Sequence, residues 1–458
     1  MTNIRLYPSS LAGEIVIPPS KSISHRAIIC ASLTSGISKI ENIDFSDDIM
    51  STIGAMKKLG AEITAKGDCL YIQGLMTNRI KGTLFDHKLE KCTTNDHFND
   101  CSNSNDVLYK NNIETVDCSE SGSTLRFIVP IFSALSQPAR YIGRGNLGKR
   151  PLSIYYNIFN EQHIRYKYKK DELDLTVIDK LKPGDFYVEG NVSSQFISGL
   201  LFALPILSAD SKIIITTEFE SKPYLDLTLS VLKVFGIDIV NNDYREFIIK
   251  GKQQYKCCNY TVEGDYSQAA YFLCANALGA DISIKGLKKD SLQGDKEIIS
   301  ILERMVTSTE INEGKIYNHT KQIEEIKIDA SQCPDIIPIV SLVAALRKGE
   351  TKILNAHRLK IKECDRLEAT KLELLKLGAN IKSTEDSLVI NGVDELRGGV
   401  DVWSHNDHRI AMMLSIASCF CKEAIILLDS ECTSKSYPNF YKDFAELGGK
   451  LYEWNMGK

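Results

Sequence analysis

Apolar and polar positions along the chain recur in one short pattern. An amphipathic helix ends at a glycine, and a strand with alternating apolar and polar residues follows. The pattern occurs in MKKLGAEI at Gly60, VLKVFGIDIV at Gly236, ELLKLGANI at Gly378 and FAELGGKL at Gly448. Glycine accepts a positive φ without strain, which is why it favours the position just past a helix C-terminus. We therefore predict four helices that end at these glycines, each followed by a strand.

Two weaker copies lack the glycine, namely YYNIFNEQHIRY near Asn160 and ILERMVTSTEI near Ser308. From Asn160 onward, successive copies are separated by 76, 72, 70 and 70 residues, whereas Asn160 follows Gly60 by 100 residues. Helix–glycine–strand turns are common in α/β proteins, but the equal spacing favours a true repeat. It predicts six units of about 70 residues that each mix helix and strand, and a period this long indicates small subdomains rather than solenoid turns.

The long first interval holds an excess of about 30 residues relative to the usual spacing of such units, and we place it at residues 76–116. This segment is polar, rich in Asn and Asp, and without periodicity. Such a composition is typical of a surface insertion. Cys92, His97 and Cys101 lie within it, but no second ligand pair flanks them, so we do not expect a metal site.

Composition and charge narrow the possible functions. The 458 residues are 43% hydrophobic and carry a formal net charge of −4. A single core stops growing at roughly 250–300 residues, which favours two domains, and the negative charge argues against nucleic-acid binding. There is no signal-peptide pattern and no run of about 18 apolar residues. The 13 scattered cysteines form no CxxC pair, as is typical of a reduced protein. We expect a cytoplasmic protein that binds neither membranes nor nucleic acid.

Six short segments place Lys or Arg beside hydroxyl-bearing residues or glycine. Backbone N–H groups, hydroxyls and cations together can bind anions, although any one segment could equally be a solvated charged surface. Three segments lie in each half of the chain, which favours a ligand with several phosphate and carboxylate groups. The segments are PPSKSISHR (18–26), SESGSTLRF (119–127), GRGNLGKRP (143–151), HRLKIKECDR (357–366), SHNDHR (404–409) and CTSKSYP (432–438).

Two further segments contribute hydroxyl groups. Ser193, Ser194 and Gln195 open an apolar helical pattern, and they form either a plain helix cap or a phosphate-binding N-terminus. The segment ESKPYLDLT (220–228) places Ser221, Lys222 and Tyr224 in a turn that we expect Pro223 to fix.

Carboxylates in or beside these segments are few. Glu363 and Asp365 lie among cations in HRLKIKECDR, and Asp335 follows a proline ahead of an apolar helix in CPDIIPIV. A carboxylate in such surroundings is either a salt-bridge partner or an acid/base group whose pKa the neighbouring charges adjust.

Nine motifs resemble, in order, those of the 5-enolpyruvylshikimate-3-phosphate synthase family: PSKSISHR, SGSTLR, KRP, SSQF, SKPY, PDIIP, KECDR, NDHR and TSKSYP. The resemblance runs from about residue 8 to 445. It implies an α/β fold of two domains, each with three βαβαββ units, and an active site in the interdomain cleft. One domain would be discontinuous, residues 1–19 with 259–458, and residues 20–258 would form the other, which carries the insertion.

The resemblance also implies the activity: transfer of the enolpyruvyl group of phosphoenolpyruvate to shikimate 3-phosphate, with no metal or organic cofactor, by a monomer. The implied shikimate 3-phosphate ligands are Lys21, Ser22, Arg26, Ser193, Ser194, Gln195, Ser221, Tyr224, Asp335 and Lys362. The implied phosphoenolpyruvate ligands are Lys21, Gly122, Arg150, Gln195, Arg366, Arg409 and Lys435, with Arg126 supporting the loop that carries Gly122.

By the same resemblance, Glu363 protonates C3 of phosphoenolpyruvate and Asp335 accepts the proton of the shikimate 5-hydroxyl. Lys21 assists these transfers and stabilises the departing phosphate. Closure of the two domains is expected to exclude water. The resemblance also predicts inhibition by N-phosphonomethylglycine, which is longer than phosphoenolpyruvate, because Gly122 leaves space that a side chain would fill. A methyl group at position 122 is therefore expected to reach only the inhibitor.

One departure from the family pattern and two alternative functions remain. Glu120 stands where many relatives carry Asn, and the sequence leaves open whether it pairs with an arginine or points away. Enzymes that transfer enolpyruvate to UDP-N-acetylglucosamine usually begin their lysine motif with Lys-Asn, whereas Ser22 follows Lys21 here. A non-catalytic anion-binding scaffold is the other alternative, and the presence of Lys21, Asp335 and Glu363 argues against it.

Overall fold

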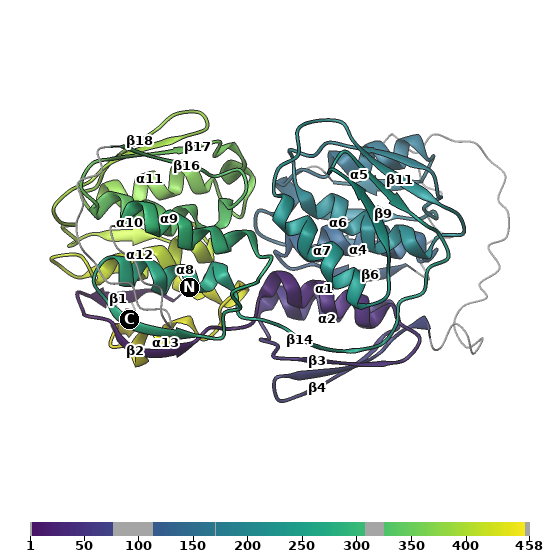
Figure 1. Cartoon of the computed structure of the whole chain (residues 1–458), viewed down its shortest axis with the longest axis horizontal. Coiled ribbons are helices and arrows are strands. Elements are labelled where there is room, and N and C mark those ends of the chain that lie inside the picture. The colour runs from purple at the N-terminus through teal and green to yellow at the C-terminus, as the bar shows by residue number, and fades with distance from the viewer. Residues whose placement is uncertain (1, 77–112, 170, 307–324, 454–458) are drawn as a thin grey trace. The chain divides into compact units, whose positions relative to one another are not determined.

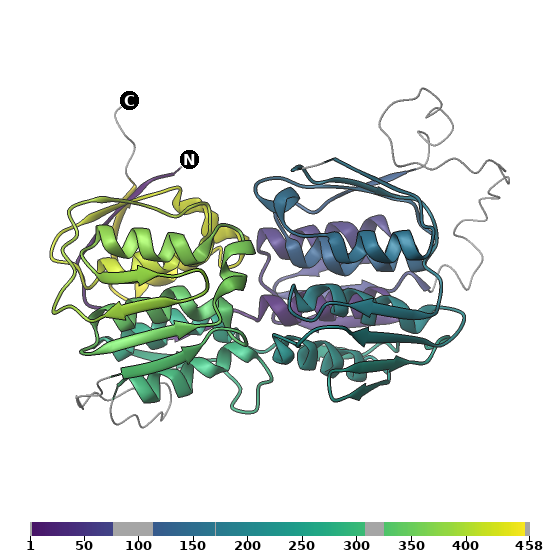
Figure 2. The ribbon, with the colours of Figure 1, turned by 90° about the horizontal axis from the view of Figure 1, so that it is seen from above.

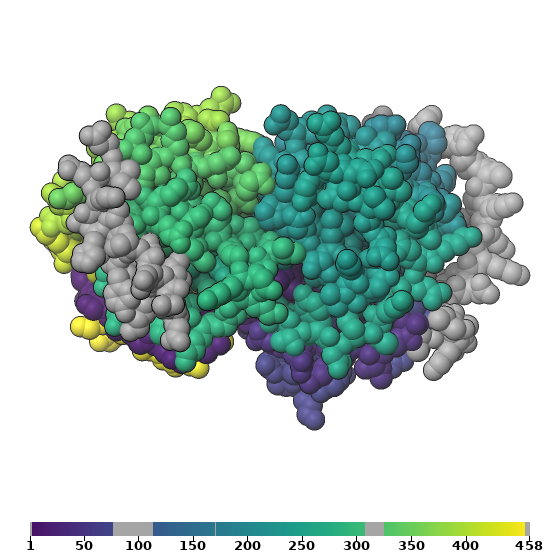
Figure 3. Space-filling model, viewed as in Figure 1, coloured from purple at the N-terminus to yellow at the C-terminus, as the bar shows by residue number. Residues whose placement is uncertain are grey.

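The computed structural model describes residues 2–76, 113–169, 171–306 and 325–453. The chain forms two compact units (Figure 1): the split unit, Met1–Lys21 with Glu263–Lys458, and the continuous unit, Ser22–Val262. Each unit has its own apolar core, and side chains fill the spaces between its ribbons (Figure 3). Most of the segment expected to be an insertion lies outside the described residues, as do Cys92, His97 and Cys101.

The strands in the described part of the chain form six sheets, five of them with four strands. In each of these five, the first two strands pair in parallel and the remaining pairs are antiparallel. A parallel pair needs a crossover connection. A helix supplies it in four of the five sheets, whereas in the fifth the paired strands Ile37–Glu41 and Asn259–Thr261 are separated by most of the continuous unit. This arrangement confirms the expected fold of small repeated βαβαββ units. The sixth sheet, β15 with β2, has two strands among the described residues.

Three of the four-stranded sheets belong to the continuous unit. Their strands, in sheet order, are β14 (Asn259–Thr261), β3 (Ile37–Glu41), β5 (Cys69–Gln73) and β4 (Glu62–Lys66); β6 (Glu114–Asp117), β7 (Ala139–Ile142), β9 (Asp174–Val177) and β8 (Tyr166–Tyr168); β10 (Asp185–Val188), β11 (Ser211–Ile215), β13 (Glu246–Ile249) and β12 (Ile239–Asn242). The helices are α1 (Lys21–Ser32), α2 (Asp47–Lys58), α4 (Gly122–Ala134), α5 (Ser153–Glu161), α6 (Ser194–Ala203) and α7 (Lys222–Val234).

The split unit holds the other three sheets. Their strands, in sheet order, are β15 (Asp281–Lys285) and β2 (Ala12–Val16); β16 (Glu325–Asp329), β17 (Glu350–Leu354), β19 (Leu388–Asn391) and β18 (Asn380–Ser383); β20 (Asp401–Trp403), β21 (Ile425–Leu428), β1 (Ile4–Tyr7) and β22 (Lys450–Glu453). The helices are α8 (Tyr266–Ala277), α9 (Ile298–Met305), α10 (Ile337–Leu346), α11 (Arg366–Lys376), α12 (His408–Ser418) and α13 (Phe440–Glu446), with short 3₁₀ helices η4 (Pro334–Ile336), η5 (His357–Ile361) and η6 (Ser430–Lys435).

The helices of each unit run alongside one another with the strands outside them (Figure 2). Helices α8 and α12 are buried on every side. Their sequences are accordingly apolar around the whole helix rather than on one face. The longest helices among the described residues, α4 and α7, have 13 residues, and none is long and apolar enough to cross a membrane.

The predicted glycine ends of four helices are confirmed. Gly60, Gly236, Gly378 and Gly448 have φ values of 110°, 78°, 98° and 99°. Each glycine N–H donates to the carbonyl three residues earlier, and the next N–H donates to the carbonyl five residues earlier. This pair of hydrogen bonds is the Schellman motif, which satisfies carbonyls that the helix itself leaves unpaired.

The two weaker copies have different outcomes. The prediction near Asn160 was three residues short, because α5 runs to Glu161 and the left-handed residue is His163, with φ of 55°. His163 makes the same two-bond motif, with Ile164 N donating to the Phe159 carbonyl. Without a glycine, no local conformational preference marked that position. The copy near Ser308 lies outside the described residues.

Helix N-termini carry many of the residues that the sequence singled out. Lys21 opens α1, Gly122 opens α4 and Arg366 opens α11, while Ser193 precedes α6 and Arg409 is the second residue of α12. The N-terminal end of a helix carries a partial positive charge and free N–H groups. The fold therefore places these residues where anions are favoured.

Candidate active site

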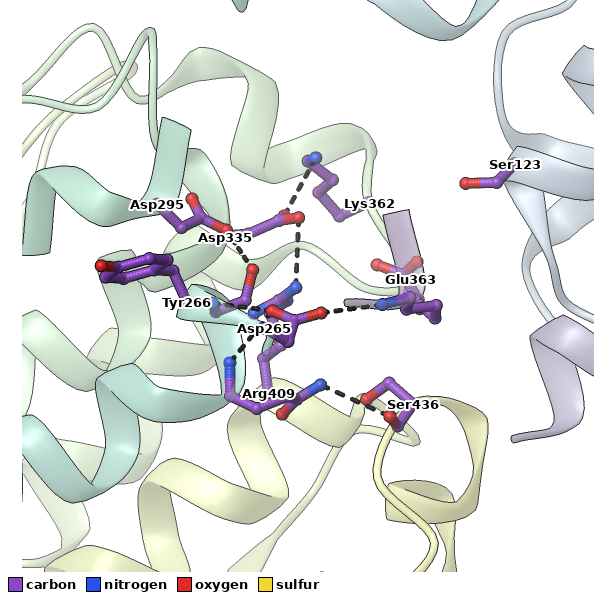
Figure 4. A network of polar contacts seen from close by, with 12 residues as sticks. Ser123, Asp265, Tyr266, Asp295, Asp335, Lys362, Glu363, Arg409 and Ser436 are labelled. Carbon is purple, nitrogen blue, oxygen red and sulfur yellow. Dashed lines mark hydrogen bonds and ion pairs between the residues drawn. The ribbon is translucent and has the colours of Figure 1, made fainter. Parts of the chain in front are cut away.

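A buried arginine organises the polar cluster of the split unit. Figure 4 labels other members of this cluster, among them Asp335, Lys362, Glu363 and Arg409. Arg366 is 1% exposed. Its Nε lies 2.7 Å from Asp407 Oδ2, its Nη1 lies 2.8 Å from Asp335 Oδ1 and its Nη2 lies 2.5 Å from Glu363 Oε2. A guanidinium presents its donors in a rigid plane, so one arginine can hold three carboxylates in fixed positions.

Asp335 also forms ion pairs with two other cations. Lys362 Nζ lies 3.2 Å from its Oδ1, and Arg409 Nη2 lies 3.2 Å from its Oδ2. Burial alone would raise the pKa of Asp335, but the charges of Arg409, Lys362 and Arg366 outweigh it and hold the pKa well below its usual range. Asp335 is therefore ionised at neutral pH. Burial lowers the pKa of Lys362 to about 8, although the charge of Asp335 opposes this shift.

Asp407 is a functional residue that the sequence reasoning missed. It is fully buried, it caps α12 by accepting from Arg409 N at 2.8 Å, and it anchors Arg366. An Asp directly before an apolar helix is a cap signature and could have identified the helix start, but not the contact with an arginine 41 positions away. The preceding residue, Asn406, accepts through its carbonyl from Lys435 Nζ at 2.7 Å.

Lys21 is fixed in the split unit through its backbone. Its N–H donates to Asp265 Oδ2 at 3.0 Å, and the other oxygen, Asp265 Oδ1, caps α8 by accepting from Ser267 N at 2.8 Å. Burial raises the pKa of Asp265, and the charge of Arg409 opposes this shift. Asp265 is thus a second carboxylate that positions a predicted site residue without having been found from the sequence.

A second polar group lies in the continuous unit, at the start of α4. Arg126 Nη1 donates to Gln195 Oε1 at 2.8 Å, and Gln195 Nε2 donates to Ser123 Oγ at 2.8 Å. A Cβ added to Gly122 would lie 2.8 Å from a nitrogen of Arg126 and of Arg150. The structure therefore brings Gly122, Arg126, Arg150 and Gln195 together, and only glycine allows the two guanidinium groups to approach this backbone.

Arg26 donates most of its hydrogen bonds to other protein atoms. It is 2% exposed, and it donates to the carbonyls of Ser22 and Tyr224 at 2.6 and 3.0 Å and to Thr228 Oγ1 at 2.8 Å. Burial lowers the pKa of Arg26 to about 10, so it remains charged at neutral pH. Three of its five N–H donors are thereby engaged, two of them with oxygens of α7 and one with a carbonyl of α1 itself.

The hydroxyl-bearing segments adopt helix starts. Ser193 caps α6, as its position predicted, by accepting from Gln195 N at 3.3 Å. The expectation of a turn at Lys222 was wrong, because α7 begins at this residue and Pro223 lies in its first helical turn. A proline fits there because the N–H it lacks would be unpaired in any case. Ser221 precedes the helix with φ of 59°.

Glu120 packs against a glycine. A Cβ added to Gly145, whose φ is 61°, would lie 2.5 Å from the carboxyl carbon of Glu120. The extra carboxylate therefore lies against the loop at residues 143–150, which also carries Arg150. The sequence left the position of Glu120 open, and the structure shows that this side chain joins the loop before α4 to the loop at residues 143–150.

The predicted site residues are divided between the two units. The split unit has Lys21, Asp335, Lys362, Glu363, Arg366, Arg409 and Lys435, and the continuous unit has Ser22, Arg26, Gly122, Arg126, Arg150, Ser193, Ser194, Gln195, Ser221 and Tyr224.

Comparisons with known proteins identify the family. The family model described as EPSP synthase (3-phosphoshikimate 1-carboxyvinyltransferase) matches residues 7–89 and 88–444. Proteins named 3-phosphoshikimate 1-carboxyvinyltransferase from Clostridioides difficile (strain 630) and Clostridium beijerinckii are 57% and 55% identical to this chain, with 100% of each chain covered.

Solved structures agree in fold. An EPSP synthase from Acinetobacter baumannii has a TM-score of 0.75 at 21% identity, with 99% of this chain and 100% of that chain covered. The enolpyruvyl transferase NikO from Streptomyces tendae has a TM-score of 0.75 at 15% identity, with 100% and 99% covered. The match to the family model and the identity to full-length relatives show that this chain belongs to the EPSP synthase (3-phosphoshikimate 1-carboxyvinyltransferase) family.

Proposed function

We propose that this chain transfers the enolpyruvyl group of phosphoenolpyruvate to the 5-hydroxyl of shikimate 3-phosphate and releases phosphate. The reaction is a step of the shikimate pathway, which leads to chorismate and the aromatic amino acids. Family membership supports this substrate pair. The observation that carries the proposal in the structure is the arrangement of Asp335 and Glu363 on one buried Arg366, with Lys362 and Arg409 beside them.

The chemistry needs one proton donor at carbon and one acceptor at oxygen. Glu363 gives a proton to C3 of phosphoenolpyruvate while the 5-hydroxyl oxygen forms a bond to C2 and loses its proton to Asp335. The product of this addition is a tetrahedral ketal phosphate. In the second step, the Glu363 carboxylate takes a proton back from C3, the C–H electron pair re-forms the double bond, and the C2–O bond to phosphate breaks so that phosphate leaves with that bond's electrons. Lys21 neutralises charge on the departing phosphate.

The ion pairs explain how base strength could depend on the substrates. Asp335 holds Lys362, Arg366 and Arg409, and its pKa is correspondingly low. A carboxylate with a low pKa is a poor base. Phosphoenolpyruvate brings a carboxylate and a phosphate that compete for the same cations. As the cations turn to the ligand, the pKa of Asp335 rises, so Asp335 becomes an effective base when the substrate is present.

We assign the ligands as the resemblance implies. The phosphoenolpyruvate side comprises Lys21, Gly122, Arg150, Gln195, Arg366, Arg409 and Lys435. The shikimate 3-phosphate side comprises Lys21, Ser22, Arg26, Ser193, Ser194, Gln195, Ser221, Tyr224, Asp335 and Lys362. The contacts of Arg26 with protein carbonyls support a role in positioning Ser22 and Tyr224, with two N–H donors left for a phosphate.

Phosphate release tests the function directly. Purified protein is mixed with phosphoenolpyruvate and either shikimate 3-phosphate or UDP-N-acetylglucosamine, and inorganic phosphate is followed over time. We expect release that depends on shikimate 3-phosphate and none with the nucleotide sugar. Release with the nucleotide sugar alone would assign the chain to the alternative reaction, and release with neither acceptor would favour the anion-binding scaffold.

We further propose that the enzyme acts as a monomer in the cytoplasm, as the family resemblance implies. Light scattering on the purified protein should give a mass near 51.2 kDa. A mass of twice this value at micromolar concentration would contradict the monomer.

A further inference from the structure

Glu373 is a buried carboxylate on α11, outside the groups that face the proposed chemistry. Its side chain is 2% exposed. It accepts from Trp403 N at 3.0 Å and from Lys376 Nζ at 2.9 Å, and its Oε1 lies 2.8 Å from His405 Nε2. These contacts outweigh the effect of burial and lower the pKa of Glu373. A buried carboxylate with three partners fixes each of them in place.

The partners Trp403 and His405 lie in the segment Trp403–Asp407, which has unusual backbone geometry. His405 and Asn406 have φ values of 54° and 53°, so two successive residues other than glycine are left-handed. This conformation is uncommon and persists only where surrounding contacts hold it. The contacts of Glu373 supply this restraint, and the rings of Trp403 and His405 lie 4.2 Å apart between centroids.

The same segment positions three residues of the proposed site. The Asn406 carbonyl accepts from Lys435 Nζ at 2.7 Å, and Asp407 accepts from Arg366 Nε at 2.7 Å and from Arg409 N at 2.8 Å.

A second connection runs from the segment to the strand end before η6. Trp403 Nε1 donates to Asp429 Oδ2 at 2.9 Å, and Ser404 Oγ donates to the Asp429 carbonyl at 3.0 Å. Asp429 directly precedes η6, the 3₁₀ helix that ends at Lys435. The segment therefore restrains Lys435 both at its ammonium group and at the start of its helix.

We infer that Glu373 and His405 form a positioning pair that holds the cations of the phosphoenolpyruvate side, above all Lys435 and Arg366, through the left-handed segment His405–Asn406. Neither side chain contacts the substrate in this account, and the inference rests on the ligand assignment proposed above. Its consequence is specific, because loss of the pair should weaken phosphoenolpyruvate use more than binding of shikimate 3-phosphate.

The first test is Glu373→Gln, with Glu368→Gln as the matched control. Glutamine has one acceptor oxygen in place of two, so it cannot serve all three partners of Glu373. Glu368 lies on the same helix, is exposed and pairs with Lys371, so its variant removes the same charge without touching the segment. We expect Glu373→Gln to lower kcat/KM for phosphoenolpyruvate by about 10- to 100-fold, mainly through KM. KM for shikimate 3-phosphate should stay close to that of wild type.

The second test does not depend on catalysis. His405→Asn removes the imidazole but keeps a residue that tolerates positive φ. The chain has two tryptophans, Trp403 and Trp454, so in a Trp454→Phe background the emission reports Trp403 alone. We expect acrylamide to quench Trp403 more strongly in both His405→Asn and Glu373→Gln than in the background protein or in Glu368→Gln.

Three outcomes separate the possibilities. Inactive wild-type protein would remove the proposed function, whereas an active wild type with unchanged kinetics in Glu373→Gln and His405→Asn would overturn the positioning pair alone. Lower thermal stability of both variants, with KM for phosphoenolpyruvate and Trp403 quenching unchanged, would also overturn it, since Glu373 would then only stabilise the fold. If Glu373→Gln does not fold, the KM for phosphoenolpyruvate and the Trp403 quenching of His405→Asn decide whether the positioning pair exists.

Discussion

Asp335 and Glu363 share one partner, because Arg366 donates to the first across 2.8 Å and to the second across 2.5 Å. The two carboxylates to which we assign the proton transfers are thus joined by one buried guanidinium. Their protonation is expected to be linked, since a ligand that draws Arg366 away changes the surroundings of both at once.

The two carboxylates should differ when each is neutralised. Glu363→Gln and Asp335→Asn are each expected to lower turnover by about 10²- to 10⁴-fold, because each removes a proton-transfer group. Glu363→Gln should retain more affinity for shikimate 3-phosphate, since Asp335 is among the ligands that we assign to this substrate and Glu363 is not. Phosphate release and calorimetric titration measure the two effects. Turnover near that of wild type in either variant would remove the residue from its assigned role.

Arg366→Lys should cost far more than an arginine-to-lysine change at the surface. A single ammonium cannot span Asp335, Glu363 and Asp407, so buried carboxylates lose their partner. We expect a loss of unfolding free energy on the order of 3–5 kcal/mol. The control is Arg140→Lys, whose side chain is 49% exposed and pairs with Asp174; its loss should stay below about 1 kcal/mol. Urea unfolding measures both, and equal losses would contradict this account of Arg366.

Asp295 should make stability depend on pH. Burial, followed by the charge of Asp335, raises the pKa of Asp295 to about 6, although Arg409 opposes the shift. In the unfolded chain the value is about 3.9. The folded protein therefore gains stability from protonation as pH falls from about 6 to about 4, and it loses that contribution as pH rises through 6.

Asp295→Asn removes this dependence. Relative to wild type, the variant should be more stable at pH 7.5 than at pH 4.5, by about 2–3 kcal/mol for a shift of this size. Its amide oxygen can still accept from Ser267, which donates to Asp295 in the native protein. Urea unfolding at the two pH values measures the difference, with a variant at the exposed Asp386 as control. A difference that does not change with pH would contradict the prediction.

Gly122→Ala should weaken the binding of phosphoenolpyruvate as well as that of the longer inhibitor. The sequence alone predicted that the added methyl would reach only N-phosphonomethylglycine. In the structure the methyl would meet the guanidinium groups of Arg126 and Arg150 at 2.8 Å. Both are ends of flexible side chains, so they can shift and the fold should tolerate the change. We expect KM for phosphoenolpyruvate to rise on the order of 10-fold. An unchanged KM together with weaker inhibition would restore the prediction from the sequence and separate Arg150 from phosphoenolpyruvate.

Sequence by itself determined the features that depend on a few neighbouring residues. Glycine conformations located the ends of α2, α7, α11 and α13, and the cap at Ser193 located the start of α6. Local backbone preferences act over three or four residues, so a single chain displays them directly. The order of nine short motifs identified the family for the same reason, because each motif is contiguous.

Tertiary structure decided which distant groups meet. Arg366 contacts Asp335 and Asp407, which lie 31 and 41 positions away, and Glu373 reaches His405 across 32 positions. No local preference encodes such contacts, since they depend on the packing of whole helices around a common core. Packing likewise directed three N–H groups of Arg26 to protein oxygens. The sequence named the residue types of the site, and only the fold determined which of these side chains contact one another.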